Sequence, residues 1–70
     1  MFKRKKDKFG EALKILDDEI EFHETMNRQY VDLGKCIQDE DLKKYHYDQA
    51  FIHLKKATEL RELRYKFNNL

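Results

Sequence analysis

The run His23-Glu24-Thr25-Met26-Asn27 is the segment of this chain that comes closest to a catalytic motif. It follows the zinc-binding pattern His-Glu-x-x-His, except that Asn27 stands where the second histidine would be. An amide is a much poorer zinc ligand than an imidazole, so the run does not predict a metalloprotease. The other two histidines, His46 and His53, lie about 10.5 Å apart along one helix face, which is too far to bind one ion.

Nucleophilic and phosphate-binding chemistry is no better represented. The chain has no serine, and its single cysteine, Cys36, has only Lys35 beside it and no histidine expected nearby. The two glycines, Gly10 and Gly34, stand far apart and form no phosphate-binding loop. We therefore expect a protein that is not an enzyme, binds no cofactor and no metal, and has no small-molecule substrate.

Apolar and aromatic positions recur every seven residues, which is typical of packed helices. The first half of the chain contains two such columns: Phe9, Leu16, His23, Tyr30 and Ile37, and beside them Leu13, Ile20, Asn27 and Gly34. The second half contains two more: His46, His53, Leu60 and Phe67, and beside them Ala50 and Ala57. The sequence therefore predicts two helices that pack along these columns.

The acidic run Asp39-Glu40-Asp41 separates the two halves. We predict a basic, flexible N-terminal arm over residues 1–8 and a single helical domain over residues 9–70. Within that domain we expect a helix over about 8–36, a turn over about 37–41 and a helix over about 41–67. Asp39 or Asp41 is expected to cap the second helix.

A short turn makes neighbouring helices antiparallel. With the turn centred near residues 38–39, His23 is expected beside His53, Asn27 opposite Ala50, and Tyr30 near His46. Polar side chains at such central positions usually fix the register of packed helices. The predicted fold class is thus an all-α, antiparallel two-helix hairpin resembling a coiled coil.

Each helix carries more apolar side chains than its partner can cover, and an exposed patch of this kind indicates association. We expect the hairpin to dimerise into a four-helix bundle, to bind a protein partner, or both. The predicted surface for self-association or partner binding consists of Ile15, Phe22, Met26, Leu33, Tyr47, Phe51 and Leu54.

Composition bounds the cellular setting. A chain of 70 residues with one cysteine can form no internal disulfide, which fits a reducing compartment. No apolar run approaches the about 18 residues of a membrane span, and no signal-type segment follows the basic start. We expect a cytoplasmic protein without membrane insertion; its Lys-, Asn- and Tyr-rich composition suggests a small bacterial or phage protein.

The net charge of +1 conceals an acidic first helix and a basic second helix. A basic cluster precedes both, and Lys3, Arg4, Lys5 and Lys6 are its candidate nucleic-acid contacts. Together with the basic second helix, this arm supports an alternative function as a small nucleic-acid-binding regulator.

Part of the sequence resembles one tetratricopeptide repeat. The resemblance rests on Tyr30, Leu33, Gly34 and Ile37 in the first helix and on Tyr47, Ala50, Leu54 and Ala57 in the second. It implies helix pairs packed through small residues and binding of a peptide or protein. The size and hairpin arrangement are also similar to those of small dimeric RNA-regulating proteins of plasmids. The function we expect is that of a protein–protein interaction module acting as an adaptor, inhibitor or regulator.

Overall fold

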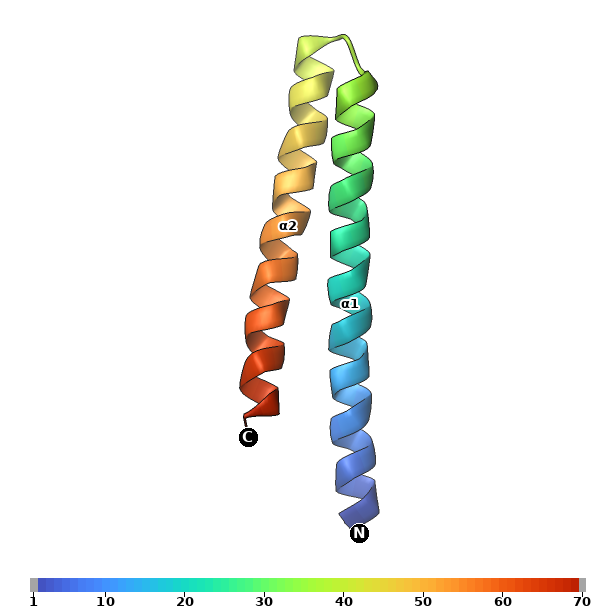
Figure 1. Ribbon diagram of the computed structural model, residues 1–70, viewed down its shortest axis with the longest axis vertical. Coiled ribbons are helices and arrows are strands. Elements are labelled where there is room, and N and C mark those ends of the chain that lie inside the picture. Colours follow the sequence, from blue (N-terminus) through green and yellow to red (C-terminus); the bar gives the residue numbers. More distant parts are fainter. Residues whose placement is uncertain (1, 70) are drawn as a thin grey trace.

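The computed structural model consists of two α-helices, α1 (Phe2–Cys36) and α2 (Glu40–Asn68), joined by a short turn. It describes the backbone of residues 2–69 and the side chains of residues 10–69. The helices run antiparallel, side by side, in a rod of 57 × 15 × 11 Å (Figure 1). The predicted all-α hairpin is therefore confirmed.

The first helix begins at Phe2, earlier than the start near residue 8 that the sequence predicted. Lysine and arginine favour helices, and no glycine or proline interrupts the chain before Gly10. The segment predicted as a flexible arm thus forms the start of α1, which projects beyond the end of α2 (Figure 1). The side chains of its candidate nucleic-acid contacts lie outside the described residues.

The turn occupies residues 37–39, and its last residue, Asp39, is the N-cap of α2. The backbone N–H of Leu42 donates to the Asp39 side chain over 2.9 Å, so this carboxylate satisfies one of the free donors at the helix start. Glu40 and Asp41 follow in the first turn, where the helix dipole favours negative charge. The acidic run that separates the two halves of the sequence therefore forms the N-cap and the first turn of α2.

Small residues bring the two helices close together. Ala50 and Ala57 are 3% and 0% exposed, and Ile20 is 8% exposed. Gly34 is also buried, and a Cβ added there would lie 3.2 Å from two ring carbons of Tyr47. Within the described residues no large side chain is fully buried. The hairpin thus has a narrow interior made mostly of small residues, and Ile20 is the one large side chain buried there among the described residues.

Contacts along the seam between α1 and α2 define the register. The Nδ1 atoms of His23 and His53 lie 2.8 Å apart, and the Asn27 amide donates to the carbonyl of Ala50 over 2.7 Å. Near the turn, the rings of Tyr30 and His46 are 5.8 Å apart. These are the pairs that the sequence predicted from the length of the turn, so the predicted register is confirmed.

Candidate association surface

Imidazole and aromatic rings cluster in the middle of the seam. One Nδ1 of the His23–His53 pair donates a proton and the other accepts it, across 2.8 Å. The Tyr30 ring stacks on His53, with centroids 5.6 Å apart and an interplanar angle of 13°. Phe22 meets both imidazoles edge-on, at 5.1 Å from His23 and 6.1 Å from His53. Phe22 therefore lies at the edge of the seam, beside the histidine pair.

In the run of residues 23–27, which partly follows a zinc-binding pattern, His23, Glu24 and Asn27 each contact a different group. His23 pairs with His53 and also lies 3.8 Å from the Glu19 carboxylate. Glu24 pairs with Arg61, and Asn27 donates to the backbone of α2. Over residues 10–69, no three His, Cys, Asp or Glu side chains gather into a group that could hold a metal ion. These side chains join the two helices to each other.

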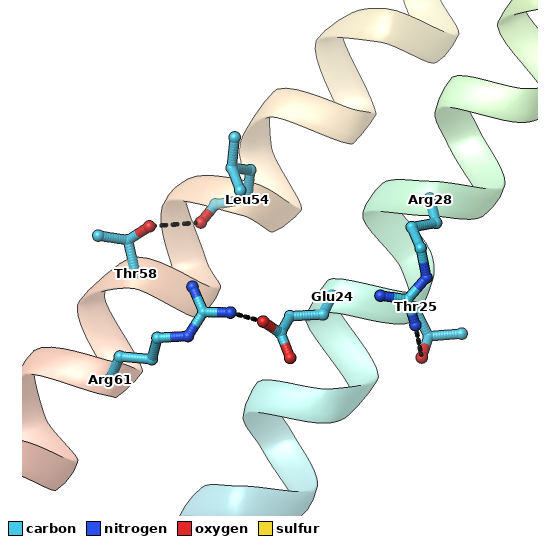
Figure 2. A network of polar contacts seen from close by, with 6 residues as sticks. All are labelled: Glu24, Thr25, Arg28, Leu54, Thr58 and Arg61. Carbon is cyan, nitrogen blue, oxygen red and sulfur yellow. Dashed lines mark hydrogen bonds and ion pairs between the residues drawn. The ribbon is translucent and has the colours of Figure 1, made fainter.

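Two arginines of α2 reach across to carboxylates of α1. Figure 2 shows the Arg61 guanidinium pointing at the Glu24 carboxylate of the facing helix. Arg64 contacts both carboxylate oxygens of Asp17, through Nε and through Nη2, the latter at 3.3 Å. The hydrogen bond and the charge of Asp17 raise the pKa of Arg64 above its ordinary value. Both ion pairs are partly exposed, so salt screens them.

Helical spacing places these ion pairs on one side of the hairpin. Asp17 and Glu24 are seven residues apart and share one column of α1. On α2, Arg61 follows Leu54 by seven residues and Tyr47 by fourteen, so all three share one column. Because Arg61 contacts Glu24, that column lies on the same side as the Glu24 column. We call this side of the hairpin the ion-pair side.

The opposite side carries a broader apolar surface, which we call the Phe22 face. The face consists of Ile15, Phe22, Met26 and Leu33 from α1 and Leu42, Tyr45, Ile52 and Leu63 from α2. The α1 members are separated by seven, four and seven residues, and the α2 members by three, seven and eleven residues. These intervals keep each set on one flank of its helix. Seven of these eight side chains are exposed, and Met26 is half-buried.

The seven residues predicted as one association surface lie on two sides of the hairpin. The four from α1 belong to the Phe22 face. Tyr47 and Leu54 belong to the ion-pair side, and Phe51 lies on the same flank of α2, three residues before Leu54. The structure therefore does not bring the α1 set and the α2 set together.

The four α2 residues of the Phe22 face, Leu42, Tyr45, Ile52 and Leu63, were not among the predicted surface residues. Tyr45 and Ile52 are 52% and 54% exposed. Their separation by seven residues is a helical repeat that the sequence does contain, outside the columns that pack in the seam. This repeat marks a second apolar stripe on α2.

At the turn end of α1, Cys36 continues the column of Ile15 and Phe22, fourteen residues after Phe22. Cys36 is a free, exposed thiol at the last residue of α1, next to the turn.

Neither helix has, within the described residues, an apolar stretch long enough to cross a membrane.

The chain was also compared with known proteins. No family model, no curated protein and no solved structure matches it. We therefore infer function from the geometry of the hairpin and from the chemistry of its surface.

Proposed function

We propose that this chain is a small, non-catalytic protein–protein interaction module that pairs with itself into a four-helix bundle and acts by binding a protein target, as an adaptor, inhibitor or regulator. One observation carries the proposal. Of the described side chains, only Ile20, Ala50 and Ala57 form a buried apolar core, whereas eleven large apolar side chains are exposed. Exposed apolar surface in this quantity is typical of a protein that buries it against another protein.

Stability supports the same conclusion. A core in a domain of this size rarely contributes more than about 3–5 kcal/mol without a disulfide, a metal or association. The lone Cys36 forms no internal disulfide. Burying apolar side chains contributes about 25 cal/mol per Å² removed from water, so association offers the hairpin stability that its narrow interior does not supply.

Sedimentation of the purified chain over a range of concentrations tests the proposal. We expect a dimer at micromolar concentration, because the apolar side chains of Ile15, Phe22 and Leu33 on α1 remain exposed in the hairpin. The double substitution Phe22→Glu with Met26→Glu should return the protein to a monomer, while far-UV circular dichroism still shows the helix content of the wild-type protein. Arg28→Glu changes the charge of α1 by the same amount, and Arg28 is exposed on the ion-pair side, four residues after Glu24; this matched control should leave the dimer intact.

A monomer that unfolds cooperatively at every concentration, with a melting temperature that does not depend on concentration, would contradict self-association.

We also propose that the protein works in a reducing compartment such as the cytoplasm, where the exposed Cys36 would remain a thiol.

A second candidate function is nucleic-acid binding, and one observation favours it. The start of α1, whose sequence is rich in lysine and arginine, projects beyond α2 as helix (Figure 1). A basic helix that extends freely can lie along a phosphate backbone. Deleting residues 2–8 should then weaken binding equally for all sequences, and affinity should fall steeply with salt. Lack of binding to any duplex or single strand at about 50 mM salt would exclude this candidate.

A further inference from the structure

We propose that the Phe22 face is covered by a second copy of this chain, with the turns of both hairpins at the same end and each α1 lying against the α2 of its partner. This inference rests on the proposed self-association and specifies which side is covered and in which orientation. The choice of side follows from where the apolar side chains and the ion pairs lie, and the occupant and the orientation follow from charge and register.

The choice of side follows from the distribution of apolar and charged side chains. The Phe22 face presents seven exposed large apolar side chains from both helices. The ion-pair side has fewer, and Asp17–Arg64 and Glu24–Arg61 cross it between the two helices. Packing a protein onto that side would remove water from these charges, which costs free energy. On the Phe22 side, no ion pair joins the two helices in the described structure, and the Glu19 carboxylate there lies 3.8 Å from His23 of its own helix.

The occupant and the orientation follow from charge. From Gly10 to Cys36, α1 carries seven acidic and three basic side chains, whereas α2 carries seven basic and five acidic ones from Glu40 to Asn68. A second copy therefore offers each helix a neighbour of opposite charge. Two symmetric dimers can cover the Phe22 face: with the turns at the same end, α1 lies against the partner's α2, and with the turns at opposite ends, like helices meet. Complementary charge favours the first arrangement and disfavours the second.

Register supports the same orientation. Within one hairpin, His23 lies level with His53 and Asn27 with Ala50. A two-fold axis parallel to the helices keeps these levels between copies, so Glu19 of one copy lies level with the partner's Ala57, next to its Lys56 and one turn along from the histidine pair. Glu19 is exposed on the Phe22 side of α1, four residues before His23, and Lys56 is exposed on the flank that carries Ile52 and Leu63. In this orientation an acid and a base meet at the centre of the interface.

The single cysteine provides the experiment, because one spin label on Cys36 marks the turn end of every copy. With the turns at the same end, the two labels lie across the diagonal of the bundle, about 20–30 Å apart including the label arms. With the turns at opposite ends, the paired length of about 27 residues separates them by about 40 Å or more. We expect the short distance by pulsed electron paramagnetic resonance on the labelled dimer.

Two pairs of variants test the face and the pairing. Phe22→Glu should abolish the dimer, whereas Phe51→Glu, the matched change of an exposed phenylalanine outside the face, should not. Glu19→Lys or Lys56→Glu should each weaken dimerisation by about 2- to 30-fold, since two exposed ion pairs are lost, and the double variant should restore it. Circular dichroism verifies that each variant keeps its helices.

The possible failures are distinguishable. A dimer with the long distance would overturn the orientation and leave self-association in place. A dimer that survives Phe22→Glu but not Phe51→Glu would overturn the choice of face. If the unlabelled wild-type protein is monomeric by sedimentation, both this inference and the proposed self-association are overturned.

Discussion

Replacing Ala57 with leucine is expected to destabilise the hairpin strongly. Ala57 is 0% exposed, and Ala50, one heptad earlier on the same helix, is 3% exposed. The small side chains at these positions allow α1 and α2 to approach closely enough for the 2.7 Å hydrogen bond from Asn27 to Ala50. Leucine adds three carbon atoms where there is no space, so the helices must separate or the new side chain must take a strained rotamer.

The magnitude follows from this lack of space. Overpacking a closely packed site costs about 1–3 kcal/mol. Alanine and leucine are both strong helix formers, so helix propensity contributes little to the difference. Against a total stability of about 3–5 kcal/mol for a core of this size, the substitution removes a large fraction. At about 4–8 °C per kcal/mol, a mid-range cost lowers the melting temperature by about 8–16 °C.

Urea unfolding followed by far-UV circular dichroism measures the effect, with all proteins at one concentration because association would shift the midpoint. Thr58→Leu is the matched control: the neighbouring residue is exposed, and its hydroxyl donates only to the Leu54 carbonyl one turn earlier. We expect the control to stay within about 0.5 kcal/mol of the wild type, as exposed substitutions usually do. An Ala57→Leu protein as stable as the wild type would refute the close approach of the helices at this position.

Further predictions concern polar contacts between the helices. Asn27→Ala should lower the free energy of unfolding by about 0.5–1.5 kcal/mol in urea, because the hydrogen bond to the Ala50 carbonyl is lost, and an unchanged midpoint would show that this bond is absent in solution. His23→Ala should also lower the free energy of unfolding, because the bond between its Nδ1 and that of His53 is lost, and an unchanged urea midpoint would contradict the pairing. Arg64→Gln should destabilise the hairpin at low salt and less so at about 0.5 M salt, whereas a difference independent of salt would argue against an ion pair with the carboxylate on α1.

Local rules in the sequence determine most of the hairpin. The heptad columns require two helices that face each other, and the carboxylates around Asp39 mark where the second helix starts. Once the turn is short, the rise per residue leaves a single pairing, and this is why His23 meets His53 and Asn27 meets Ala50. The early start of α1 at Phe2 was missed because a run of lysines satisfies both a flexible tail and a helix.

Only the tertiary structure decides which exposed side chains share a surface. Residue spacing gives the angle of a side chain around its own helix but not the side of the neighbouring helix on which it lies. For this reason Phe22 and Leu54, both outside the seam, were assigned to one surface, although the Glu24–Arg61 ion pair places Leu54 on the opposite side of the hairpin from Phe22. Tyr45 and Ile52 lie on the Phe22 face for the same reason. The packing of α2 against α1 sets these positions, because it determines which flank of α2 lies beside each flank of α1.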